Sequence, residues 1–481
     1  MVEASDGLGF TSREGSLAVV IMQDALPGVK RFLKAAGLRK TAEQHVTAFI
    51  VAFVMHWGRM SAAAASSAIR IQPRHRAQAM RFLARECRTR DLAVLMQLAE
   101  LLLAFEHRRQ GCWLLIVDQT YCTQQGLKTE NTFSHGQKAK SGKERRRRKK
   151  LARRRCHCFV MGLLITPSGL RLPLYRSYYT QEYLKQKNQR RGQRNLPPLA
   201  YRKQTELAAE LVHTAPVPKK AKVVVLGDTA FDAEVLQEAC RKEGYSWIVS
   251  MNQERVLEGK KPRPKVWSLA SALPARRFAT VKLTPGKGRH VAQRRVAACR
   301  IGRKAKTRTF YVHPKRLTVS SVGEVQVVFS TMIQPQSGKP VEIQKVLMTN
   351  DLTLSAAQIV ELYDLRWQIE LFFKELKSTL GFHQYRFRKF EKVERWVELC
   401  LITFLYLEWH RAEKLARRDL SDKQKQWWRW QRSHGLCVAV RQETEEKELD
   451  RLADYTKTKG GLRKLKRILR AARPLEQRQA A

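Results

Sequence analysis

The sequence has no long apolar run: none of its 481 residues lies in a stretch of about 18 hydrophobic residues, the length that a membrane-spanning helix needs. It is also short of acids, because 43 Asp and Glu stand against 92 Lys and Arg, a formal net charge of +49. A charge of this size opposes compaction and attracts polyanions, so nucleic acid is the expected partner. No basic amphipathic helix has a lipid-seeking face, so we expect no membrane partner.

Cysteine is sparse and irregularly placed. The nine Cys residues form no regular spacing, which suits a reducing compartment. Only Cys156-His157-Cys158 has the appearance of half a metal site, and no second ligand pair stands nearby at zinc-finger spacing. We therefore favour buried strand thiols over a structural zinc. The first 15 residues lack the basic-then-apolar order of a secretory signal, so we expect an intracellular protein.

Changes in composition divide the chain into five predicted regions. They are a helical N-terminal region that would bind DNA (1–108), the first part of an α/β core (109–250), a β-rich insertion (251–344), the second part of the core (345–415), and a basic helical C-terminal region for oligomerisation or DNA contact (416–481). In the first region, helices over Ser61–Ile71 and Arg76–Cys87 are compatible with a helix-turn-helix or with a packed basic hairpin. In the last, Trp427, Trp428 and Trp430 could form an interface or be buried within the chain.

The predicted core begins with short apolar runs bounded by turn residues. Strands are expected over Trp113–Val117, His157–Thr166, Gly169–Arg176, Lys222–Leu226 and Tyr245–Ser250, with helices around Lys203–Val212 and after Asp232. Three adjacent strands followed by alternating helix and strand indicate an α/β fold: a mixed sheet with flanking helices. Asp232, just before Ala233-Glu234-Val235, suits the N-cap of the second helix.

Basic charge is densest between Lys138 and Arg155. These 18 residues hold twelve Lys or Arg against one acid, Glu144. Such a run is usually a solvated loop. In a chain of this charge we favour an arm that becomes ordered on DNA phosphates, and its central residues are Arg145, Arg146, Arg147, Arg148, Lys149 and Lys150.

Three acids stand out by their positions. Asp118 is expected to end the first strand, Asp228 ends a later strand, and Glu370 lies on a helix beyond the insertion. If the strand ends converge at one edge of the sheet, these hard oxygen ligands could hold two magnesium ions around a scissile phosphate. Repulsion among three acids would itself favour a cation. An Asp after an apolar strand is otherwise commonly a turn or cap residue.

The expected Glu370 helix carries a charged stripe. Opened by Leu354, one continuous helix would place Tyr363, Arg366, Glu370 and Lys377 within an arc of roughly 60°. The acid could ligate a cation while the bases bind an anionic backbone. The alternative is an exposed amphipathic helix with intrahelical ion pairs. A separate apolar stripe already accounts for burial of the helix, and it comprises Leu362, Leu365, Ile369, Phe372 and Leu376.

The pattern Tyr363-x-x-Arg366-x-x-x-Glu370-x(6)-Lys377 resembles the helix signature of DDE transposases of bacterial insertion sequences. The similar branch of that family carries a β-rich insertion before its Glu. Trp113–Asp118 looks like the family's first-acid strand and Gly227–Asp232 like its second. The interval of 142 residues between the second and third acids (370 − 228) is typical once the insertion is counted. The resemblance covers roughly residues 113–388.

The resemblance implies an RNase H-like core and a cut-and-paste DNA transposase, which cleaves at transposon ends and joins them to target DNA by phosphodiester hydrolysis and transesterification. Asp118, Asp228 and Glu370 would be the catalytic metal ligands, for two Mg²⁺ ions or Mn²⁺ in their place. The partners would be double-stranded DNA, as inverted repeats and as target, and a second copy of the chain in the synaptic complex. The enzyme would be cytoplasmic, in a bacterium, and nucleoid-associated when bound to DNA.

The resemblance also implies DNA-binding roles. Tyr363, Arg366 and Lys377 would bind phosphates of the transposon end. Trp267 is the only Trp in the insertion and would be the candidate to hold a flipped base, although core packing accounts for it equally well.

Two other functions remain open from the sequence. An RNase H-like nuclease or junction resolvase would share the carboxylates but would not join strands. A non-catalytic DNA- or RNA-binding protein derived from a transposase would explain the charge equally well. Loss of cleavage with binding retained on Asp118→Ala would separate catalysis from binding.

Overall fold

The computed structural model describes residues 26, 28–55, 91–108, 110–124, 128–134, 155–259, 262–284, 290–294, 307–430 and 434–463. They fall into two compact units. The first contains the described residues up to Phe105, those of Gln124–Glu130 and those from Phe372 onward, and the second contains those of Glu106–Thr123 and Asn131–Leu371. The five predicted regions remain a prediction.

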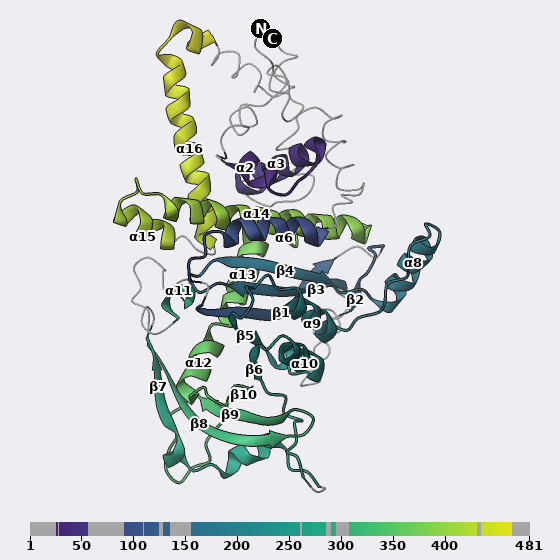
Figure 1. Ribbon diagram of the computed structural model, residues 1–481, viewed down its shortest axis with the longest axis vertical. Coiled ribbons are helices and arrows are strands. Elements are labelled where there is room, and N and C mark those ends of the chain that lie inside the picture. The colour runs from purple at the N-terminus through teal and green to yellow at the C-terminus, as the bar shows by residue number, and fades with distance from the viewer. Residues whose placement is uncertain are drawn as a thin grey trace, which may run out of the picture. The chain divides into compact units, whose positions relative to one another are not determined.

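A ten-stranded mixed sheet is the centre of the second unit (Figure 1). Its strands are β1 (Cys112–Gln124), β2 (Phe133–Ser134), β3 (Arg155–Ile165), β4 (Arg171–Ser177), β5 (Lys222–Gly227), β6 (Ser246–Ser250), β7 (Ala279–Leu283), β8 (Arg308–Val319), β9 (Gly323–Thr331) and β10 (Lys345–Thr349). Their order across the sheet is β2-β3-β1-β5-β6-β10-β9-β8-β7, with β4 also paired to β3.

The middle of the sheet is parallel and buried. β1 pairs in parallel with β5, and β5 in parallel with β6. Their apolar residues, such as Leu114, Val224 and Ile248, are inaccessible to solvent, as expected for strands covered on both faces. The predicted α/β fold, an RNase H-like mixed sheet with flanking helices, is confirmed.

The β-rich insertion extends this same sheet. β10 lies antiparallel to both β6 and β9, and β8 pairs antiparallel with β9 and β7. Strands that are distant in sequence therefore share one hydrogen-bonded ladder. Between the strands, the described residues of the insertion form short helical turns, namely η3 (Val266–Ala272), η4 (Ala275–Arg277) and α11 (Val291–Arg294).

Helices of the second unit connect and cover the strands. They are α8 (Gln181–Gly192), α9 (Gln204–His213), η2 (Thr229–Phe231), α10 (Glu234–Lys242), α12 (Ala356–Asp364) and the start of α13 (Trp367–Ser378). α9 packs on β3, β4 and α10 through buried residues such as Leu207 and Leu211.

The first unit is helical. Its described helices are α2 (Val29–Lys34), α3 (Lys40–Met55), α6 (Asp91–Leu103), α14 (Phe390–Ala416), α15 (Asp422–Trp430) and α16 (His434–Thr456). The long helix α14 packs on α3, α6 and α15, and its buried Arg411 forms an ion pair with Glu408 one turn away. Trp428 is buried in this unit, whereas Trp427 is 39% exposed.

Two sequence predictions about the first unit lie outside what the structure describes. Both members of the predicted helix pair, Ser61–Ile71 and Arg76–Cys87, fall there. Among the helices that are described, none has both the length and the apolar character needed to cross a membrane.

Candidate active site

Two of the predicted acids lie side by side on parallel strands. The register pairs Ile116 of β1 with Leu226 of β5, so two residues further on Asp118 comes level with Asp228. Neighbouring strands are about 4.8 Å apart, so these carboxyl groups are close. β5 ends immediately before Asp228, as predicted.

The prediction that Asp118 ends its strand is wrong, because β1 continues to Gln124. Residues beyond Asp118 alternate between buried and more accessible positions, which is typical of a strand with one covered face. The apolar run Trp113–Val117 marks only the half of β1 that is buried on both faces. In the polar half, buried and accessible positions alternate, and this alternation was not among the predicted strands.

Arg366 joins the third acid to the first. Its Nη1 donates to Oδ2 of Asp118 at 3.1 Å, and its Nη2 lies 3.6 Å from Oε1 of Glu370. The side chains of Asp118 and Arg366 are only 10% and 14% exposed, whereas that of Glu370 is 40% exposed. The structure therefore brings all three predicted acids into one electrostatic group around a guanidinium.

Burial and neighbouring charge raise the pKa of Asp118 to about 7. Burial is the largest cause, and repulsion from Asp228 and Glu370 adds to it. The Gln119 N–H, 2.7 Å from Oδ1, and the Arg366 guanidinium act in the opposite direction without cancelling the shift. Asp118 is thus an acid whose ionised form needs more positive charge than the protein supplies.

The single helix predicted over Tyr363–Lys377 is interrupted. α12 ends at Asp364 and α13 begins at Trp367, and the junction is tightened by i→i+3 hydrogen bonds from the N–H groups of Leu365 and Arg366. The junction contains no Pro or Gly, so no local breaker announces it. A tight turn inside a helix is frequent at functional positions, and here it lies where Arg366 meets Asp118.

Tyr363 forms the back of the site. It is buried, and its hydroxyl interacts with Ser250 and Arg366. Ser250 in turn accepts a hydrogen bond from Thr229, the residue after Asp228, at 3.1 Å. Burial is the main reason that the pKa of Tyr363 is raised. Through Tyr363, these contacts help to fix the position of Arg366.

Lys345, the first residue of β10, belongs to no recognisable sequence motif. Its Nζ lies 5.1 Å from the centre of the Tyr363 ring, in reach of a cation–π contact. The residue as a whole is solvent-exposed, but partial desolvation of its ammonium, and then Arg366, lower the pKa of Lys345. Asp364 and Asp228 act on that pKa in the opposite direction, so the Lys345 ammonium lies within electrostatic range of both Arg366 and one of the predicted acids. Only the tertiary pairing of β10 beside β6 could reveal this.

A cavity of about 200 Å³ adjoins these residues. Its polar lining includes Lys345, Arg366 and an ion pair between Arg308 and Asp364. Its remaining lining is mostly apolar or aromatic, and it comprises Phe310, Met332, Leu347, Val360, Tyr363 and Trp367, together with Ser330, Thr331 and Gln344. An apolar space with cations beside it suits a flat, anionic ligand such as a nucleotide.

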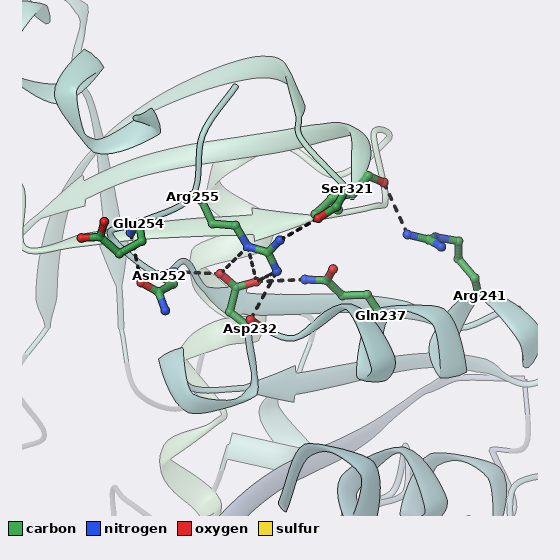
Figure 2. A network of polar contacts seen from close by, with 8 residues as sticks. Asp232, Gln237, Arg241, Asn252, Glu254, Arg255 and Ser321 are labelled. Atoms are coloured by element: carbon green, nitrogen blue, oxygen red, sulfur yellow. Dashed lines mark hydrogen bonds and ion pairs between the residues drawn. The ribbon is translucent and has the colours of Figure 1, made fainter. Parts of the chain in front are cut away.

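Asp232 is not a helix N-cap, so that prediction is wrong. Ala233 occupies the cap position of α10, and the Asp232 carboxylate instead accepts from Arg255 Nη2 at 2.8 Å, Gln237 Nε2 at 2.9 Å and the Asn252 N–H at 2.8 Å (Figure 2). Its side chain is 0% exposed. A buried guanidinium satisfies the carboxylate better than free helix N–H groups, and the pair ties α10 to the start of the insertion.

The donor set suits a divalent cation in its chemistry. Asp118, Asp228 and Glu370 are hard oxygen ligands, and the raised pKa of Asp118 reflects charge that a cation would balance. However, no three His, Cys, Asp or Glu side chains in the described part of the chain are arranged as a ready-made metal site. Arg366 supplies the positive charge between these acids instead.

The other sequence candidates are placed as follows. Lys377 lies on α13, with its Nζ 5.9 Å from the Phe373 ring. Trp267, on η3, is half-buried and is not among the residues that line the cavity, whereas Trp367 lines it and is 55% exposed. Cys156 and Cys158 are buried in β3, as favoured. The basic residues 145–150 lie outside the described residues.

One comparison with known proteins covers two of the three acids. A family model described as a transposase DDE domain matches residues 199–406, a stretch that contains Asp228, Glu370 and the Tyr363–Lys377 signature. Asp118 lies before it. A search of curated proteins finds no match. The resemblance drawn from the motifs is confirmed over this stretch, which matches the DDE domain of transposases.

Proposed function

We propose that the protein is a metal-dependent cut-and-paste transposase, which hydrolyses the phosphodiester bond at each transposon end and joins the freed 3′-hydroxyls to target DNA. One observation carries the proposal: Asp118 is a buried acid level with Asp228 on a parallel strand and bridged by Arg366 to Glu370. A buried acid that two other acids repel is costly unless a cation balances its charge. The DDE family generally uses divalent metal ions.

In this proposal Asp118, Asp228 and Glu370 hold two Mg²⁺ ions, or Mn²⁺ in their place. When bound, the ions supply an activated water or 3′-hydroxyl and stabilise the leaving oxygen. Arg366 exchanges its carboxylate partners for a DNA phosphate, which a planar guanidinium binds with two parallel hydrogen bonds. Tyr363 is buried behind Arg366 and acts through it.

Further contacts with DNA follow from charge and position. Lys377 on α13 and the basic residues Arg145, Arg146, Arg147, Arg148, Lys149 and Lys150 are proposed to bind phosphates. Lys345 is proposed as an additional phosphate ligand because its ammonium stands beside Arg366. The double-stranded partners are the terminal inverted repeats and the target, and the working form is a homodimer that synapses two ends inside a bacterial cytoplasm.

We propose that the cavity holds a nucleotide unstacked beside the scissile phosphate. Its mostly apolar lining suits a base, and its cations suit the attached phosphate. Trp367 is the aromatic residue placed to stack on such a base, and its 55% exposure leaves it accessible. Trp267 remains a candidate by location only.

The test uses DNA that flanks the reading frame. Matched inverted repeats there would supply substrates, and the purified chain should cut them in the presence of Mg²⁺. Asp118→Asn and Glu370→Gln should abolish cutting while binding, measured by gel shift, is retained. Glu238→Gln, an exposed acid on α10, serves as the matched control. Normal cutting by both site variants would refute the site.

Precut ends separate transposition from the second candidate, a nuclease or resolvase without strand transfer. A transposase should join a precut 3′-hydroxyl to a target plasmid, and a simple nuclease should not. Binding without any cutting, in wild type and variants alike, would instead favour the non-catalytic DNA-binding protein.

A further inference from the structure

Helix α8 and the segment after it form a hairpin, Thr180–Lys203, that projects from the sheet of the second unit (Figure 1). In the helix only Tyr183 and Leu184 are buried. The hairpin therefore contributes little to the core of its unit, and a need for apolar burial does not explain its presence.

The hairpin is nevertheless held in one conformation. Thr180 caps the helix by accepting from the Tyr183 N–H at 3.2 Å. Asn188 closes the hairpin with two hydrogen bonds, both 2.9 Å, to the N–H and C=O of Leu199. At its base, Asn131 accepts from the Thr180 N–H at 2.8 Å. An element ordered by its own polar contacts is pre-organised for a partner.

The composition of the hairpin is one-sided. It holds seven Lys or Arg and a single acid, Glu182. The exposed side chains of α8 are those of Gln181, Glu182, Lys185, Gln186 and Gln189, and exposed Arg194 follows the helix. Gln side chains can donate and accept hydrogen bonds together, as base edges require, whereas Lys and Arg neutralise phosphates.

We infer that the α8 hairpin is a second DNA-contacting element, which docks in the major groove of duplex DNA. The inference rests on the proposed function only in taking duplex DNA as the substrate. An α-helix is roughly 10–12 Å in diameter and the major groove is about 12 Å wide, so α8 fits it. A second copy of the chain is disfavoured at this surface because two hairpins with six excess positive charges each would repel.

The first experiment removes two positive charges. K185Q/R194Q should bind duplex DNA roughly tenfold more weakly, and the slope of log K against log salt should fall by about 1.8, since each phosphate contact contributes about 0.9. K219Q/K220Q removes the same charge from an exposed loop of the same unit and should bind like wild type. Equal affinities and slopes for the two variants would overturn the inference.

The second experiment tests the groove. Q186A/Q189A keeps the charge and places a strong helix former in α8, so the helix should persist. In wild type, the protein should protect guanine N7 from methylation over part of its footprint, and the variant should lose that protection. An unchanged protection pattern would overturn major-groove docking, and so would a change of oligomeric state at unchanged DNA affinity.

The tests of the hairpin can fail or succeed independently of the test of the proposed function. Asp118→Asn should lose cleavage but keep the footprint of the hairpin. K219Q/K220Q should keep both wild-type cleavage and the wild-type footprint. If wild type does not cut but the hairpin variants still alter binding and protection, the proposed function fails and this inference stands.

Discussion

Asp118 and Asp232 are both buried acids of the second unit that face an arginine, yet their surroundings differ. Asp232 accepts hydrogen bonds from Arg255, Gln237 and Asn252, so every charge in its cluster has a partner (Figure 2). Asp118 has Arg366 and one N–H, but Asp228 and Glu370 repel it and its pKa rises to about 7.

The difference separates structural from chemical use of a buried charge. A carboxylate with a full set of donors stabilises the fold, because breaking the pair would strand a charge. A carboxylate crowded by others weakens the fold unless a ligand brings charge. Asp228 and Asp232 are four residues apart, yet the Asp228 carboxylate accepts from the Ala230 N–H whereas that of Asp232 accepts from Arg255.

The largest expected effect is on catalysis. Asp118→Asn should lower the rate of DNA cleavage at least about a thousandfold, equivalent to about 4 kcal/mol of barrier, because the proposed function makes Asp118 a metal ligand. The melting temperature should not fall, because the ionised acid is a destabilising group. If Asp118→Asn instead unfolded, and its refolded fraction still cut DNA, Asp118 would have a structural role like that of Asp232 and the contrast would be lost.

Asp232→Ala should cost about 3–5 kcal/mol of stability because it leaves Arg255 buried without its partner. Chemical denaturation of the purified variant measures this. The paired change Asp232→Leu/Arg255→Met should recover much of the loss, since it removes both charges. If the single variant is as stable as wild type, the cluster is not the anchor between α10 and the insertion.

The stability of the metal-free protein should depend on the titration of Asp118. The folded pKa, about 7, exceeds the ordinary aspartate value of 3.8, so the folded state binds more protons between these values and stability falls as pH rises through that window. The total change in the free energy of unfolding is about 4 kcal/mol. In EDTA, Asp118→Asn should therefore gain stability over wild type above pH 7 and lose that advantage near pH 4. An advantage independent of pH would contradict it.

The smallest effects are expected at the edge of the site. Lys345→Met should slow cleavage about tenfold, equivalent to about 1.4 kcal/mol, by removing one phosphate contact. Trp367→Ala should act similarly through lost stacking, worth about 1–3 kcal/mol. Lys339→Met is the control, because Lys339 is an exposed base that comes shortly before β10 in the sequence. Equal rates for all three variants would remove Lys345 and Trp367 from the site.

Much of the fold could be predicted from local patterns. Buried parallel strands such as β5 and β6 are short apolar runs, and their positions agree with the structure to within a residue or two. The full length of β1 and the break between α12 and α13 could not, because both depend on neighbours: strand pairing in the first case and the contact of Arg366 with Asp118 in the second.

The sequence by itself determined the charge, the α/β class and the motif that joins Tyr363, Arg366 and Glu370, because periodicity and residue type are local properties. Only the tertiary structure decided that Lys345 faces Arg366, that Trp367 lines the cavity, and that Asp232 is an anchor. Each of these follows from which strand lies next to which. The order of the strands depends on burial and hydrogen bonding over the whole sheet, so it cannot be predicted from any local stretch of residues.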